Sequence, residues 1–202
     1  RMHAREETMR SPLLGEEMRR VLPVVQPGGS DSQMLDNTLE FLYMSGMPLP
    51  LAGMALLPVP WQGQAEKTPW RDLYRYYATM MEPWDGPASI LFFDGDVMGA
   101  VLDRNGLRPS RYYITNDDNL ILSSEVGVLD IDPSKILVKE RLHPGKMLLV
   151  DTVAGRVIDD EELKEKYANE EPYGEWLDRN LIELKDLKIP NKDIPKYTRE
   201  EC

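Results

Sequence analysis

The chain has 202 residues, a mass of 23.2 kDa and a formal net charge of −11. This length suits one ordinary domain with room for a tail. The acidic balance argues against a nucleic-acid partner and against a membrane surface, since both need clustered positive charge. The single cysteine, Cys202, permits no internal disulfide and suits a reducing compartment, so we expect a cytoplasmic protein.

The first residues look like the middle of a structure. The chain opens without an initiator methionine and without a secretory signal pattern. Residues 1–7 are typical of a helix interior, yet no capping residue precedes them. We therefore expect the chain to begin inside a larger protein. The longest mostly apolar stretch, 49–61, contains three prolines and is too short to span a bilayer.

The first third of the chain is predicted to be helical. A short helical turn is expected at 15–21, followed by a Pro-Gly-Gly loop at 27–29. Ser30 with Gln33 three residues later forms a capping box, so a helix should begin at Ser30. Its apolar residues recur at helical spacing, and Gly46 is a suitable stop.

Two more helices are expected before the middle of the chain. A short one covers 51–57, opened by the proline before it, and a loop covers 58–67. Thr68 is a predicted cap, with Pro69 at the first helical position of a helix that runs to about residue 81.

Short β runs separated by turn signals follow. They are 88–93, 97–102, 111–115, 120–124, 136–139, 147–152 and 156–158. The Asp94-Gly95 turn and the spacing of about ten residues are typical of an antiparallel meander. Acidic residues at 159–162 start another helix, and a further short helix is expected at 174–179.

This order of elements predicts the fold class. Helices first and antiparallel strands later, without alternation, indicate a layered α+β fold. A parallel nucleotide-binding sheet is disfavoured, because the sequence has neither a G-x-G-x-x-G motif nor a P-loop. We divide the chain into a domain over 1–187 and a linker, or the start of the next domain, over 188–202.

Candidates for metal or nucleophilic chemistry are weak. His3 and His143 lie far apart in the sequence, and neither has a second histidine at ligand spacing, so we expect no metal site. Cys202 lies in a polar tail with no base to lower its pKa. We therefore expect no catalytic residue within the chain.

The segment from Gly28 to Asp31 is the strongest candidate for binding. Glycines allow close approach to the backbone, and a helix start offers N–H groups to an anion. Asp31 can pair with an ammonium group, so both signs of charge suit a zwitterion such as an amino acid. The alternative is that Asp31 only complements the helix dipole, and the pattern leaves both open.

A charged turn at 102–109 has two interpretations as well. Asp103 pairs with Arg104 or Arg108 for structural reasons, or one of these arginines binds a carboxylate. The composition of the turn does not separate the two.

Five ordered segments carry a resemblance to a known family. They are 22–32 (LPVVQPGGSDS), 81–87 (MEPWDGP), 102–109 (LDRNGLRP), 124–128 (SEVGV) and 172–176 (PYGEW). Together they resemble the class II glutamine amidotransferase domain of glutamate synthase large subunits, over residues 1–187. The second and third segments set this group apart from other class II amidotransferases.

The resemblance implies an N-terminal nucleophile hydrolase fold, in which two antiparallel sheets stack between helical layers (αββα). It also implies hydrolysis of glutamine to glutamate and ammonia by an N-terminal Cys, with an oxyanion hole in a His-Asn-Gly motif. The ammonia then aminates 2-oxoglutarate on a synthase domain that holds FMN and an iron–sulfur cluster. The resemblance further implies that electrons come from a reducing subunit or ferredoxin.

Only part of that site has counterparts in this chain. Asp31 resembles the family residue that pairs with the α-ammonium of glutamine, and Gly29 and Ser30 are expected to line the same pocket. Asn105 and Arg108 are expected to be structural. The N-terminal Cys, the His-Asn-Gly motif and the arginine that binds the substrate carboxylate have no counterpart in the sequence.

We therefore expect the C-terminal part of the amidotransferase domain, without cofactor and inactive by itself. Its expected partners are glutamine, the missing N-terminal half of the domain and the synthase domain. Two alternatives stay open: a non-catalytic module that binds an amino acid, and a fragment of another class II amidotransferase.

Overall fold

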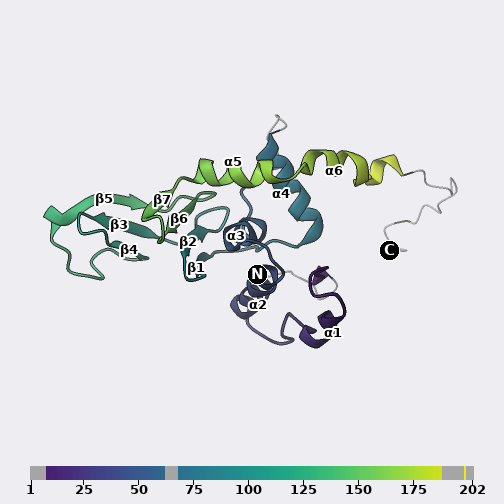
Figure 1. Cartoon of the computed structure of the whole chain (residues 1–202), viewed down its shortest axis with the longest axis horizontal. Coiled ribbons are helices and arrows are strands. Elements are labelled where there is room, and N and C mark those ends of the chain that lie inside the picture. The colour runs from purple at the N-terminus through teal and green to yellow at the C-terminus, as the bar shows by residue number, and fades with distance from the viewer. Residues whose placement is uncertain (1–7, 62–67, 188–197, 199–202) are drawn as a thin grey trace.

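The computed structural model describes residues 8–61, 68–187 and 198 (Figure 1). His3, Cys202, the helical expectation for 1–7 and most of the predicted linker lie outside these residues. The domain boundary at 187 stays a prediction.

Helices precede and follow the strands, as the sequence predicts. The helices are α1 (Met18–Val21), α2 (Asp31–Met44), α3 (Leu49–Leu56), α4 (Pro69–Met80), α5 (Asp160–Glu170) and α6 (Tyr173–Asn180). The strands are β1 (Ser89–Phe93), β2 (Val97–Leu102), β3 (Arg111–Thr115), β4 (Leu120–Ser123), β5 (Ile136–Arg141), β6 (Met147–Asp151) and β7 (Arg156–Ile158). Short 3-10 turns cover Gly15–Glu17, Pro133–Lys135 and Leu184–Asp186.

Side-chain caps explain why the helices begin where they do. The Ser30 hydroxyl accepts the Gln33 N–H at 3.2 Å, and the Thr68 hydroxyl accepts the Arg71 N–H at 3.4 Å. Both predicted helix starts are therefore confirmed to the residue. At the other end of α2, Gly46 takes a φ of +89°, which a residue with a side chain rarely adopts.

The strands form two antiparallel sheets rather than one meander. The first has the order β1-β2-β6-β7 and the second β4-β3-β5. The expected meander is wrong at the step from β2 to β3, because β2 pairs with β6 and not with β3. The neighbouring pairs β1–β2 and β3–β4 are antiparallel as expected. A tight turn after β2 sends the chain out of the first sheet, so that β3 begins the second.

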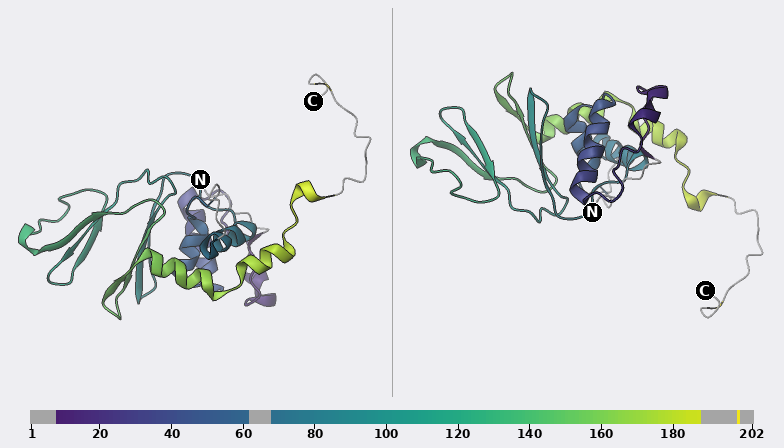
Figure 2. Two further views of the ribbon diagram at one scale, coloured as in Figure 1. Left: turned by 90° about the horizontal axis from the view of Figure 1, so that it is seen from above. Right: turned by 90° about the horizontal axis from the view of Figure 1, so that it is seen from below.

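Alternation along β2 shows how the layers pack. Val97 and Val101 join the main apolar core with the helices, whereas Ala100 and Leu102 join a smaller core with residues of the second sheet such as Tyr112. Helices, first sheet and second sheet thus form three successive layers, and the helices lie on one side of both sheets (Figure 2). The predicted α+β class with stacked antiparallel sheets is confirmed, and the described residues supply one of the two helical layers.

A phenylalanine ring between two glycines joins these layers. Phe92 on β1 lies opposite Gly99 on β2, and a Cβ at Gly99 would stand 2.1 Å from the ring. On α3, a Cβ at Gly53 would stand 3.2 Å from the same ring. Gly99 needs glycine because the ring occupies the space that a side chain would take, whereas a Cβ at Gly53 would make a tight contact with the ring.

A largely buried ion pair fixes α5 to the first sheet. Asp160 accepts the N–H of Met147 at 2.9 Å and binds the Lys164 ammonium at 2.7 Å. Lys164 also donates to the Gly145 carbonyl at 2.8 Å. The carboxylate and ammonium are therefore both hydrogen-bonded, as a buried pair requires.

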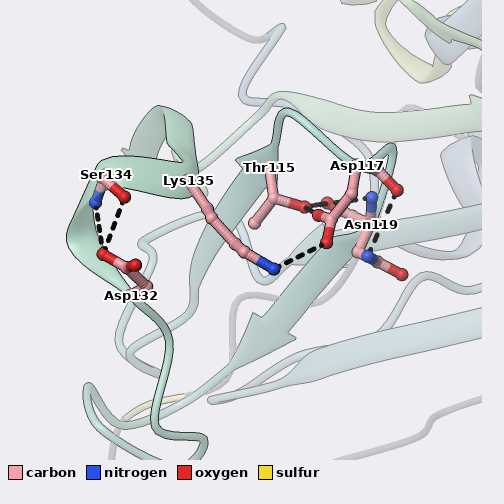
Figure 3. Close-up of polar contacts among 6 residues, drawn as sticks. All are labelled: Thr115, Asp117, Asn119, Asp132, Ser134 and Lys135. Carbon is pink, nitrogen blue, oxygen red and sulfur yellow. Dashed lines mark hydrogen bonds and ion pairs between the residues drawn. The ribbon is translucent and has the colours of Figure 1, made fainter.

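The turn between β3 and β4 is held by polar contacts (Figure 3). The Thr115 hydroxyl donates to one oxygen of Asp117 at 2.5 Å, and Lys135 binds the other at 3.3 Å. These contacts lower the pKa of Asp117 to about 2, with the Thr115 hydroxyl as the largest cause. Asn119 donates its backbone N–H to Thr115 at 3.1 Å and completes the turn.

Candidate functional site

The predicted binding residues lie where the loop after α1 enters α2. Gly29 ends the loop, Ser30 is the N-cap, and Asp31 is the first residue of the helix. The Asp31 carboxylate is exposed and has neither a hydrogen bond nor an ion pair with any other described residue. It is therefore available to bind an ammonium group.

The helix beneath this site is fixed by burial. Leu35, Thr38 and Phe41 of α2 are buried, and Thr38 donates its hydroxyl proton to the Met34 carbonyl at 2.8 Å. Since these residues lie on one face, the opposite side of the first turn remains open to solvent. The site thus stands on a rigid element of the core, which favours precise recognition.

The first turn also offers hydrogen-bond donors. Ser30 accepts the N–H of Gln33, and its carbonyl accepts that of Met34 at 3.0 Å. The backbone N–H groups of Asp31 and Ser32 have no acceptor among the described residues, as is usual in the first turn of a helix. A carboxylate and amide donors therefore lie side by side, which is the combination that the sequence analysis associates with a zwitterion.

The two glycines of the loop differ in role. Gly28 has a φ of +77°, and a Cβ there would meet nothing within 4 Å. At Gly29 a Cβ would stand 2.8 Å from Oε1 of Gln33 and 3.1 Å from the carbonyl oxygen of Gln26. The close approach at Gly29 is therefore made by the chain itself, whereas the space beside Gly28 is open. The sequence indicated Gln33 only through the capping box.

A small apolar pocket lies alongside α2. It has a volume of about 300 Å³ and is lined by Leu14, Val21, Val24, Asn37, Glu40, Phe41 and Met44. A larger hollow of about 570 Å³ lies between α4 and the α5–α6 junction, and its lining includes the carboxylates of Asp72, Glu170 and Glu171. Neither includes Asp31, so the candidate site rests on the loop and the first turn of α2.

The charged turn after β2 proves to be a structural device built on Asp103. This residue is 2% exposed and accepts the N–H groups of Ala88 at 3.1 Å, Asn105 at 3.0 Å and Leu107 at 3.2 Å. The interpretation in which Asp103 pairs with Arg104 or Arg108 is wrong, because backbone donors occupy its oxygens. The hydrogen bonds to Asp103 hold the turn in which the chain leaves the first sheet after β2.

The turn at 102–109 also contacts the segment 81–87, which is the other segment that distinguishes the resemblance. Arg104 forms an ion pair with Asp85 at 2.9 Å, so MEPWDGP and DRNGLRP meet in space. Trp84 donates its backbone N–H to the Leu56 carbonyl at 2.8 Å and thereby ties this contact to α3. Arg108 is exposed and forms no ion pair with a described residue.

Other chemistry-bearing residues are dispersed. His143 lies 3.5 Å from Glu140 in the turn before β6. Within the described ranges, no group of three or more His, Cys, Asp or Glu side chains is arranged to hold a metal ion. In the same ranges, no helix combines the length and the apolarity needed to cross a bilayer.

Comparison with known proteins decides the family. The family model of class II glutamine amidotransferases matches residues 1–176. The chain belongs to this family. The resemblance carried by the five sequence segments is thus confirmed.

The relatives of this amidotransferase chain are much longer proteins. It is 47% identical over 184 residues to the glutamate synthase [NADPH] large chain of Bacillus subtilis. The matched region covers 91% of this chain and 12% of that protein. It is 48% identical over 188 residues to glutamate synthase [NADH] of Schizosaccharomyces pombe, covering 92% and 9%. The ferredoxin-dependent glutamate synthase 2 of Arabidopsis thaliana, chloroplastic, is 44% identical over 188 residues, covering 91% and 12%. The chain spans about a tenth of these relatives.

Proposed function

We propose that this chain supplies the part of a glutamine site that recognises the α-ammonium group, within the amidotransferase domain of a glutamate synthase. The observation that carries the proposal is the exposed Asp31 carboxylate, which has no partner among the described residues. Family membership supplies the substrate class, because class II amidotransferases are named for glutamine. Gly29 and Ser30 are the neighbouring residues that we expect to line the site.

The proposed reaction is hydrolysis of glutamine to glutamate and ammonia, which then serves the reductive amination of 2-oxoglutarate. Asp31 acts by binding and orientation: its negative charge holds the ammonium group, so that the side-chain amide points away toward the nucleophile. The donors of the first helical turn lie beside it. Asp31 itself takes no part in bond breaking.

We propose that the nucleophile lies outside these 202 residues. The single cysteine is at position 202, and the sequence contains no His-Asn-Gly motif. The isolated chain should therefore release no ammonia from glutamine above the uncatalysed rate. Turnover that disappears in Asp31→Ala would contradict this, since it would show a complete site within the chain.

The cofactors of the family are proposed to be held by other parts of the enzyme. An iron–sulfur cluster needs several thiolate ligands, and one cysteine does not supply them. FMN and the cluster supply the reductive step when bound to the synthase domain. The relatives are named for NADPH, NADH or ferredoxin. A cytoplasmic location also stays a proposal.

The experiment is the substitution Asp31→Asn in the glutamate synthase that contains this chain. Loss of a charged hydrogen bond should raise the KM for glutamine roughly 10- to 100-fold, with kcat little changed. The matched control is Asp36→Asn, an exposed carboxylate further along α2. Equal KM values in wild type, Asp31→Asn and Asp36→Asn would refute the proposed role.

A further inference from the structure

Residues of the first two turns of α2 hold the loop residue Gln26. Gln33 donates its side-chain amide to Oε1 of Gln26 at 2.7 Å. The backbone N–H of Gln26 donates to Oδ1 of Asn37 at 3.4 Å. Because Gln33 and Asn37 are one helical turn apart, both reach the loop from the same face of α2. We call these three residues the Gln26 clamp.

The clamp is a departure from the usual capping box. In that motif the side chain of the fourth residue turns back to the backbone N–H of the N-cap. Here Ser30 still accepts the Gln33 N–H at 3.2 Å, but the Gln33 side chain binds Gln26 instead. Gln33 therefore fixes the preceding loop to the helix rather than completing the cap.

The clamp also closes the loop tightly. The Gly29 N–H donates to the Gln26 carbonyl at 3.1 Å. A Cβ at Gly29 would stand 2.8 Å from Oε1 of Gln33, so the loop packs directly against the clamping side chain. The backbone of Gly29 and Ser30 is thus held at one position beside Asp31.

We propose that Gln26 and Gln33 are positioning residues for glutamine recognition, acting through the loop that carries Gly29 and Ser30. The proposal rests on the function proposed above for Asp31. Loosening the loop moves the backbone of Gly29 and Ser30 from its place beside the Asp31 carboxylate and weakens glutamine binding. The bond-breaking step is not touched, so KM should change and kcat should not.

The experiment uses two single variants, Gln26→Met and Gln33→Met, and their double variant in the glutamate synthase that contains this chain. Methionine keeps the length of the side chain and favours helices but cannot form this hydrogen bond. Each single variant should raise the KM for glutamine roughly 2- to 10-fold. The double variant should raise it no further than the larger single effect, because the two residues act through one bond.

Two further variants separate positioning from general damage. Gln33→Glu should retain the wild-type KM, because the Gln26 amide can rotate and donate to the new carboxylate. Asp36→Met places the same hydrophobic side chain at an exposed position of α2 outside the clamp and should also retain it. Additive effects of the two Met variants, or a fall in kcat that matches the rise in KM, would overturn the proposal.

Amide hydrogen exchange gives a readout that needs no activity. In the glutamate synthase that contains this chain, exchange of the Gly29 N–H should be several-fold faster in Gln33→Met than in wild type, and unchanged in Gln33→Glu. If Asp31→Asn raises the KM but the clamp variants change neither KM nor exchange, the clamp proposal alone fails. If Asp31→Asn leaves the KM unchanged, both proposals fail.

Discussion

At the scale of single residues, four described carboxylates differ in what binds them. Asp103 and Asp160 are buried, and their oxygens accept hydrogen bonds from backbone N–H groups. Asp117 is bound by a hydroxyl and an ammonium in a turn. Asp31 has no such partner among the described residues. The first three stabilise the fold, whereas Asp31 is free to act on a ligand.

The turn around Asp117 gives a prediction on pH. The pKa of Asp117 is lowered from 3.8 to about 2, so its contacts stabilise the turn above pH 4 and are lost as the pH falls through about 2. Thr115→Val removes the contact that lowers this pKa most, so the pKa should rise toward its ordinary value. NMR titration of the Asp117 carboxyl carbon measures the shift.

Asp132 is the internal control for this titration. Its pKa is lowered chiefly by the backbone N–H of Ser134, which Thr115→Val does not touch. Its titration midpoint should therefore stay in place. An unchanged midpoint for Asp117 in the variant would show that the Thr115 hydroxyl is not the cause.

The starts of two helices could be predicted from the sequence, because helix capping depends only on neighbouring residues. Ser30 and Thr68 cap helices as predicted, because a hydroxyl followed by free N–H groups needs no distant partner. Asp103 was different, since its donors come partly from Ala88, 15 residues earlier in the chain. Such a long-range bond leaves no local signal, so the alternative of an arginine pair stayed open.

At the scale of elements, the Phe92 ring on β1 restricts which residue can stand opposite it on β2. Gly99→Ala places a methyl group in the space of that ring and should destabilise the chain by about 3 kcal/mol. Equilibrium denaturation in urea measures this cost. The sequence showed a glycine in a strand but not what approaches it.

Measuring Gly99→Ala in a Phe92→Leu variant tests whether the Phe92 ring causes the loss of stability. In Phe92→Leu the smaller side chain leaves room for the methyl group, so Gly99→Ala should cost clearly less there. An equal cost in both backgrounds would mean that the backbone of β2, rather than the ring, requires glycine.

Strand pairing was less predictable than strand position. The runs at 97–102, 111–115 and 156–158 match β2, β3 and β7 to the residue, because alternation and turn signals are local. Which strands are neighbours depends on the Asp103 turn and on the return of β6 to β2. Both are contacts between distant parts of the chain, and the sequence pattern alone favoured the simpler meander.

At the scale of the whole molecule, one helical layer and two stacked sheets carry the proposed site at the start of α2. Two sequence segments that distinguish the resemblance, MEPWDGP and DRNGLRP, meet through Arg104 and Asp85. Their role in this structure is to connect α3, β1 and β2. Family identity could thus be predicted from structural segments, while the binding role depends on Asp31.

The central feature of the proposed function is that Asp31 binds the α-ammonium group of glutamine. The most direct measurement compares the apparent affinity of the enzyme for glutamine with that for the analogue that lacks the α-amino group. Wild-type enzyme should prefer glutamine roughly 10- to 100-fold, and Asp31→Asn should lose most of that preference by losing affinity for glutamine alone. An equal preference in both proteins would contradict the account.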